Sequence, residues 1–161
     1  MAGFNTLGKA PRAIVKKRAP RRAAPMATLL RASAVSRARS RGLLLVAGRA
    51  FACRFGRSGL TYRKREGDGA SPCGRFALAR IFFRPDRLPR PVSGLPVIAL
   101  RKDMGWCDDI AAARYNRLIR LPAPCRHEAM WRDDHLYDLC VEIGYNNAPA
   151  RRGRGSAIFL H

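Results

Sequence analysis

Glycine and proline interrupt the apolar segments of this chain so often that long helices have little room to form. The clearest case is segment 84–96, which contains four prolines and therefore excludes a regular helix. The apolar runs on either side of it, 76–83 and 97–101, have the length of strands. Strands separated by glycine- and proline-rich loops, with few helical stretches, predict a mainly β architecture.

Further strands are predicted on both sides of this region. Residues 42–47 and 50–55 flank Gly48 and Arg49, a pattern typical of a β-hairpin. Segment 156–161 has the apolar pattern of a central strand that is buried on both faces. The remaining expectations are a strand at 136–143, a turn at Asn146–Asn147, and an irregular segment at 106–121 with one helical turn near 111–114.

Positive charge divides the chain into two parts. The formal net charge is +21 and the isoelectric point is about 11.5. Residues 1–41 contain eleven of the lysines and arginines and no acid, and they lack an apolar period. We predict that this basic tail is disordered, or partly helical over 24–34. Residues 42–161 are numerous enough to bury one core and are predicted to form one domain.

This basicity indicates an anionic partner, which could be nucleic acid, a membrane surface or an acidic wall polymer. The aromatic residues lie within apolar runs or among acids, and they are not interleaved with the basic tail as stacking platforms would be. That distribution argues against nucleic-acid recognition. No apolar run approaches the ~20 residues of a transmembrane helix, and no clear secretory signal is present.

The cysteines argue against a metal centre and against a complete disulfide framework. Their number is odd and no pair has the CxxC spacing. Cys125 and His127 form a lone ligand-like cluster, which we interpret as an ordinary loop. No cofactor is predicted. The five thiols are expected to be small buried hydrophobic groups: Cys53, Cys73, Cys107, Cys125 and Cys140.

Two other patterns suggest chemistry at first sight. Gly67, Gly69 and Gly74 lie in a glycine-rich loop, but the GxxxxGK[ST] pattern and a following helix are missing, so we predict a tight β-loop. The pairs Asp108–Asp109 and Asp133–Asp134 have the composition of glycosidase carboxylates. Adjacent acids usually point in different directions on a solvated loop, and we predict that structural role for both pairs.

Three motifs follow one another along residues 42–161. The first contains Ser71-Pro72-x-Gly74-x-Phe76, and the second is Gly105-Trp-Cys-Asp-Asp followed by Arg114-Tyr-Asn-Arg. The third comprises Leu136-Tyr-Asp, Gly144-Tyr-Asn and Gly153-Arg-Gly-Ser-Ala-Ile-Phe-Leu-His. In this order they resemble the L,D-transpeptidase (YkuD-type) catalytic domain, a peptidoglycan-remodelling cysteine acyltransferase. The resemblance implies a YkuD-like β-sandwich that is incomplete at its C-terminal end.

The resemblance also implies a site and a reaction. His161 matches the active-site histidine of the family and would be the general base, while Tyr145 and Asn146 would border the substrate cleft. In the family a cysteine follows in a Ser-x-Gly-Cys-like turn, attacks the stem tetrapeptide, releases D-alanine and forms an acyl-enzyme. The implied partners are peptidoglycan stem peptides, and the implied location is the periplasm or cell envelope.

Because that cysteine turn would lie after His161, we expect residues 1–161 to form no acyl-enzyme. Cys140 and Cys73 lack an exposing turn and are poor substitutes as nucleophiles. We also expect exposed apolar surface, an unpaired sheet edge and poor solubility. Two other functions stay open at this point: a non-catalytic protein that binds peptidoglycan, and a nucleic-acid-binding protein that acts through residues 1–41.

Overall fold

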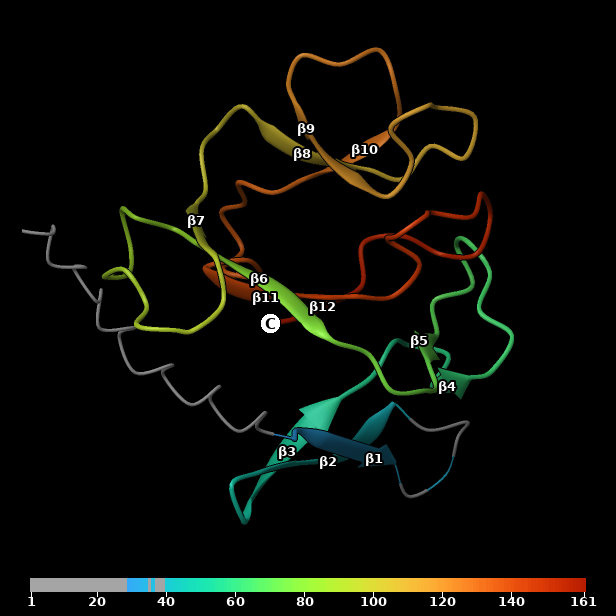
Figure 1. Ribbon diagram of the computed structural model, residues 1–161, viewed down its shortest axis with the longest axis vertical. Helices are drawn as coiled ribbons and strands as arrows, with labels where there is room; N and C mark the ends of the chain where they lie inside the picture. The colour runs from blue at the N-terminus through green and yellow to red at the C-terminus, as the bar shows by residue number, and fades with distance from the viewer. Residues whose placement is uncertain (1–28, 35, 37–39) are drawn as a thin grey trace, which may run out of the picture.

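A computed structural model of the chain describes residues 29–34, 36 and 40–161 (Figure 1). These residues contain twelve β-strands in four sheets and no helix, which confirms the mainly β prediction. None of the described residues forms a helix with the length and apolar character to cross a bilayer. The strands are β1 (Arg31–Ala34), β2 (Arg41–Val46), β3 (Arg49–Arg54), β4 (Leu60–Thr61), β5 (Ser71–Pro72), β6 (Leu78–Phe83), β7 (Val97–Ala99), β8 (Met104–Cys107), β9 (Arg117–Arg120), β10 (His127–Ala129), β11 (Leu139–Ile143) and β12 (Phe159–Leu160).

The predicted hairpin is present as β2 and β3, which pair in an antiparallel ladder. Its turn consists of Ala47 and Gly48, one residue earlier than the sequence suggested. Both residues have positive φ, 47° and 78°, as a type I′ turn requires. Gly48 has no side chain and adopts positive φ without steric cost, which explains why it marks the position of the hairpin turn in the sequence.

Strand β1 corrects the prediction for the basic tail. Of the segment 24–34 that was predicted to be partly helical, Arg31–Ala34 pairs antiparallel with β2, from Arg31 opposite Leu45 to Ala34 opposite Gly42. A short isolated helix cannot offset its nucleation cost, whereas the free edge of β2 supplies hydrogen bonds at once. The remaining tail predictions for residues 1–28 lie outside the described residues.

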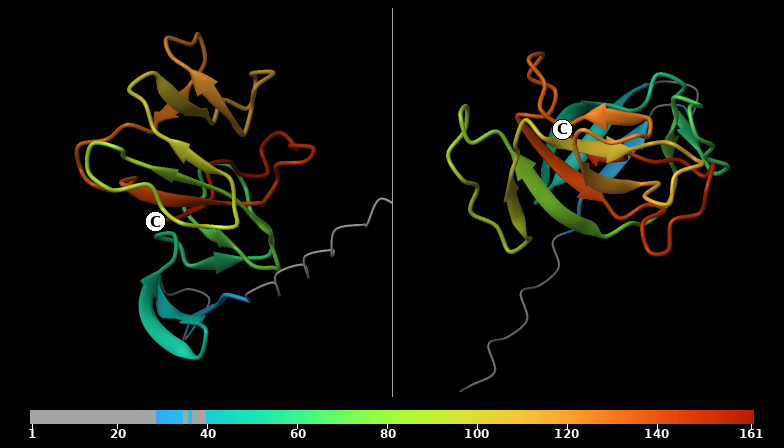
Figure 2. Two further views of the ribbon diagram at one scale, coloured as in Figure 1. Left: turned by 60° about the vertical axis from the view of Figure 1, so that its left-hand side comes forward. Right: turned by 90° about the horizontal axis from the view of Figure 1, so that it is seen from above.

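The central sheet has the strand order β12-β11-β6-β7. Strand β11 is antiparallel to β6 and β12, and β6 is parallel to β7. The predicted strands at 76–83, 97–101 and 136–143 are therefore confirmed as β6, β7 and β11, each shorter than expected. In Figures 1 and 2 this sheet lies between the β10-β8-β9 sheet and the β1-β2-β3 sheet.

The third sheet, β10-β8-β9, overlaps the segment 106–121 that was predicted to be irregular. That prediction is wrong at both ends, where β8 and β9 pair from Met104 opposite Arg120 to Cys107 opposite Arg117. Between the two strands the chain forms hydrogen-bonded turns, in which the Ala112 amide donates to the Asp109 carbonyl and the Tyr115 amide to the Ala112 carbonyl, and the helical turn predicted near 111–114 is not formed. Each of these strands has only four residues, too few for a clear alternating pattern.

The core lies between the central sheet and the β10-β8-β9 sheet. Aromatic rings from the two sheets meet edge to face, with centroids 6.2 Å apart for Phe82 and Trp106 and 5.0 Å apart for Trp106 and Phe159. Aromatic pairs favour this geometry because the positive edge of one ring meets the negative face of the other. The buried core cluster consists of Phe82, Leu100, Trp106, Met130, Tyr137 and Cys140.

Strand β12 differs from the central buried strand predicted at 156–161. It has two half-buried residues, pairs only with β11, and lies at the edge of the sheet. Gly155 and Ala157 have positive φ, 98° and 52°, so the chain is not extended until Ile158. The predicted unpaired edge is thus present in the described structure, next to His161.

Candidate functional site

His161 directly follows β12 and packs against the ring of Tyr137. The ring centroids are 5.6 Å apart and the planes meet at 84°. Tyr137 is only 5% exposed, and its hydroxyl donates a hydrogen bond of 2.6 Å to Glu128 Oε1 in β10. Three separate segments therefore contribute to one group, which we name the His–Tyr–Glu cluster: His161, Tyr137 and Glu128.

The surroundings of His161 favour a neutral imidazole. Although the residue is exposed overall, partial burial of its ring lowers the pKa below the ordinary 6.5, and the positive charge of Arg132 acts in the same direction. The carboxylates of Glu128 and Asp134 oppose this shift without reversing it. At neutral pH the imidazole is consequently unprotonated and able to accept a proton.

Tyr137 remains a hydrogen-bond donor under the same conditions. Burial raises its pKa far above the ordinary 10, and the neighbouring Glu128 carboxylate raises it further. The guanidinium of Arg132 lies 5.8 Å from the centroid of the Tyr137 ring. The neutral phenol of Tyr137 therefore packs against the His161 imidazole and donates its hydrogen bond to Glu128.

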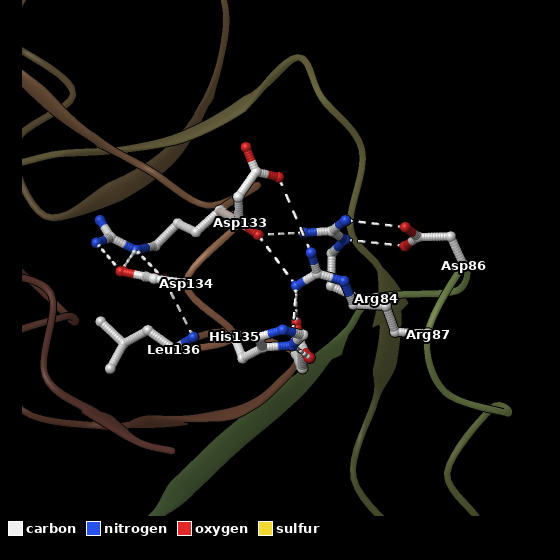
Figure 3. A network of polar contacts seen from close by, with 9 residues as sticks. Arg84, Asp86, Arg87, Asp133, Asp134, His135 and Leu136 are labelled. Carbon is white, nitrogen blue, oxygen red and sulfur yellow. Dashed lines mark hydrogen bonds and ion pairs between the residues drawn. The ribbon is translucent and has the colours of Figure 1, made fainter.

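Arg84 anchors the segment that carries Tyr137 (Figure 3). Its side chain is 3% exposed, lies 3.7 Å from the centroid of the Trp131 ring, and donates to the backbone carbonyl of Arg132. Two further bonds, of 2.9 and 2.8 Å, reach both oxygens of Asp86. This bidentate pair raises the pKa of Arg84, so the buried guanidinium stays charged.

Arg87 fixes the end of the same segment, just before β11 (Figure 3). It donates a 2.7 Å bond to Asp138 Oδ1, while His135 Nδ1 lies 2.7 Å from Asp138 Oδ2. Burial pushes the pKa of Asp138 upward, but the bonds from His135 and Arg87 outweigh it and the pKa is lowered. The Asp133 carboxylate lies farther away, 3.9 Å from Arg87. Two arginines of the loop after β6 thereby fix segment 131–138, which carries the Tyr137 ring that packs against His161.

Tyr145 and Asn146 lie at the other end of the β11–β12 pair from His161. Val141 is opposite Leu160, so the chain beyond Ile143 runs away from the histidine. The Tyr145 hydroxyl donates to the carbonyl of Arg154 at 2.8 Å. The structure therefore does not bring the two residues into contact with His161, and their assignment to a substrate cleft stays a prediction.

Asn146 instead braces the loop that precedes β12. It has a positive φ of 51° and forms a bend with Tyr145, one residue earlier than the turn predicted at Asn146–Asn147. Its Oδ1 accepts a bond of 2.8 Å from the Arg151 amide, and its Nδ2 donates one of 2.8 Å to the Gly155 carbonyl. The side chain is engaged within its own loop.

Asn116 is a structural residue that the motifs contain but whose role the sequence did not reveal. It is 2% exposed and has a φ of 55°. Its Oδ1 accepts from Trp106 Nε1 at 2.9 Å and from the Ala157 amide at 3.2 Å. Its Nδ2 donates to the carbonyls of Asn146 and Tyr145, at 2.7 and 3.3 Å. One amide therefore connects β8 to both ends of the loop before β12.

A second polar junction ties the glycine-rich loop to the same region. Glu66 Oε2 accepts bonds from the hydroxyls of Tyr115, at 2.5 Å, and Ser156, at 2.9 Å. Within the loop, Asp68 accepts from the amides of Arg65 and Ala70, at 2.8 and 2.9 Å. The loop is closed by its own carboxylate between β4 and β5, in agreement with the tight β-loop that was predicted.

Neither Cys140 nor Cys73 has the surroundings of a nucleophile that acts with His161. Cys140 is fully buried, and burial together with the Glu128 charge raises its pKa to about 12. Cys73 is half-buried and directly follows β5, which belongs to the two-stranded β4-β5 sheet and not to the sheets that carry His161 and Glu128. A thiolate is the reactive form of cysteine, and burial suppresses it.

The other sequence candidates have structural partners. Asp108 accepts from Arg126 Nε at 3.1 Å, and Asp134 is paired with Arg132. His127 Nδ1 lies 2.8 Å from the carbonyl of Cys125, a backbone contact. Within residues 29–34, 36 and 40–161, no three His, Cys, Asp or Glu residues are placed to hold a metal ion.

The site as a whole is a neutral imidazole at a sheet edge, supported by a buried phenol and a carboxylate. Such a group can take a proton from a thiol or an alcohol and return it to a leaving amine. A separate open cavity of about 650 Å³ lies between segments 109–114 and 119–125, and His161 does not line it. No protein-family model, no curated protein and no solved structure matches the chain.

Proposed function

We propose that residues 42–161 belong to an L,D-transpeptidase-type catalytic domain in which His161 is the general base. The observation that carries this proposal is the position of His161 at the end of an edge strand, with a ring shielded by Tyr137 and a lowered pKa. A base must be unprotonated at the operating pH, and this environment provides that state.

In the proposed reaction a cysteine thiol loses its proton to His161 and attacks the carbonyl carbon before D-alanine in a stem tetrapeptide. The imidazolium then protonates the departing amine, and an amine of a second stem takes the acyl group. In the family the thiol comes from a Ser-x-Gly-Cys-like turn that follows the histidine. We assign this role to none of the five described cysteines.

Charge supports an anionic substrate. Residues 42–161 contribute about half of the net charge of +21, and stem peptides carry several carboxylates. A positive surface raises the local concentration of such a polymer and accelerates its association. The proposed partner is therefore peptidoglycan, and the proposed location is the periplasm or cell envelope.

The test is an NMR titration of the full chain with the tetrapeptide L-Ala-γ-D-Glu-diaminopimelate-D-Ala. The chain has three histidines, and substitution of each by glutamine assigns its ring signals. We expect a saturable shift of the His161 signals and a weaker response to the tripeptide that lacks D-alanine. His135 is the matched control because it is exposed and outside the cluster.

The proposal fails if the His161 signals do not respond, or if all three histidines shift together and 0.5 M salt removes the effect. We further expect a carbapenem to leave the intact mass of the chain unchanged, because Cys140 is buried and the other thiols lie outside the cluster.

A further inference from the structure

Two of the cysteines lie side by side at the end of the β10-β8-β9 sheet. Cys107 is the last residue of β8 and is opposite His127, the first residue of β10. The pairing continues one step beyond the strands, since the Asp108 amide donates to the Arg126 carbonyl at 3.3 Å. Cys125 is therefore the diagonal neighbour of Cys107 on the same face of the ladder.

The two thiols also interact electrostatically. Burial raises the pKa of Cys107, and the neighbouring Cys125 thiol raises it further, whereas no other cysteine contributes to the raised pKa of Cys53 or Cys140. Cys125 lies in a bend before β10, where no ladder bond fixes its backbone. Diagonal neighbours are typically about 7–8 Å apart, so this bend has to move toward β8 before the two sulfurs reach disulfide geometry.

Access to the pair is one-sided. Cys107 is completely buried, whereas Cys125 is half-buried and lines the open cavity of about 650 Å³. An external oxidant can therefore approach Cys125 through the cavity, whereas Cys107 is shielded from solvent. The arrangement is that of an attacking cysteine on the surface and a resolving cysteine beneath it.

We propose that Cys107 and Cys125 form a disulfide when the protein is exposed to a small disulfide oxidant such as oxidised glutathione. The Cys125 thiolate attacks one sulfur of the oxidant, releases one thiol and leaves a mixed disulfide. Cys107 then loses its proton, attacks the Cys125 sulfur and expels the second thiol. The two cysteines lose two electrons and two protons in total, and the oxidant is reduced to two thiols.

The bond would cross-link the two ends of the segment that contains β9 and the cavity. Closing a loop of this length restricts the unfolded chain, so the oxidised form should melt at a temperature roughly 5–10 °C higher than the reduced form. This inference depends only on the placement of the two cysteines as diagonal neighbours and holds whether or not the domain is a transpeptidase.

The experiment starts from the reduced full chain, which is treated with oxidised glutathione, quenched with N-ethylmaleimide and digested with trypsin without reduction. Cleavage after Lys102, Arg114, Arg120 and Arg126 releases one cysteine in peptide 103–114 and another in peptide 121–126. We expect these two peptides to be linked and the other three cysteines to carry maleimide.

Cys125→Ser should abolish both the linked peptide and the rise in melting temperature, and Cys73→Ser should retain both. The inference is overturned if oxidation yields only glutathione adducts, if the link involves Cys53, Cys73 or Cys140, or if Cys125→Ser melts like the oxidised wild type. Cys107 is left unchanged throughout, because replacing a fully buried side chain would affect folding by itself.

Discussion

Replacing Asn116 by alanine tests whether one buried amide holds the loop before β12 in place. The substitution removes four hydrogen bonds and leaves Trp106 Nε1 and the Ala157 amide without their acceptor. An unsatisfied buried polar group costs about 1–3 kcal/mol, and alanine at positive φ costs about 1 kcal/mol more. If water partly replaces the Asn116 amide at the carbonyls of Tyr145 and Asn146, we expect the free energy of unfolding to fall by about 4–6 kcal/mol. Domains of this size are stable by about 5–15 kcal/mol.

The assay is urea unfolding followed by tryptophan fluorescence, with two companion variants. Asn116→Gly removes the same bonds but tolerates the φ of 55°, so it should be about 1 kcal/mol more stable than Asn116→Ala. Asn116→Asp keeps an acceptor for Trp106 but turns an oxygen toward the carbonyl of Asn146, so it should be at least as unstable as Asn116→Gly. The reasoning is refuted if Asn116→Ala loses less than about 1.5 kcal/mol, or if Asn116→Asp matches the wild type.

Three further outcomes are expected. The imidazole of His161 should titrate in NMR with a pKa below 6.5. Because the unfolded chain then binds a proton more readily than the folded chain, the free energy of unfolding should fall as the pH drops from 6.5 to the pKa of the folded state. A measured pKa at or above 6.5 would contradict this expectation. Cys140 should resist iodoacetamide at pH 8 until urea unfolds the chain, since its pKa is about 12; rapid labelling of the native protein would show that it is accessible. Arg84→Lys should lower the free energy of unfolding in urea by about 2 kcal/mol, because the lysine ammonium can neither bind Asp86 in bidentate fashion nor stack as a plane on the Trp131 ring. A decrease below about 0.5 kcal/mol would rule out an anchoring role for Arg84.

The elements that the sequence predicted correctly have strong local signals. Gly48 forms the hairpin turn, and the prolines of 84–96 separate β6 from β7. The strands that were missed or misplaced depend on partners distant in the chain. Strand β1 forms on the free edge of β2, β8 and β9 are too short for periodicity, and β12 is shortened by backbone conformations at Gly155 and Ala157.

The candidate site shows the same division. A resemblance selected His161, and the structure places it at a strand end. The partners Tyr137 and Glu128 come from other segments, and only the packing of β10 against the loop before β11 brings them together. Asn116 lay within a quoted motif, yet its four bonds extend to residues 10 to 41 positions away and could not be read from local sequence.

The β1-β2-β3 sheet contributes no side chain to the core cluster, whose members and close neighbours all lie between Phe82 and Phe159. Leu43, Leu45 and Phe51 remain substantially exposed on it. Because apolar burial supplies most of the free energy that opposes opening, this sheet should behave as a separate cooperative unit of lower stability. Its backbone amides would then exchange with solvent through local unfolding, while those of β6 and β11 exchange only when the whole domain unfolds.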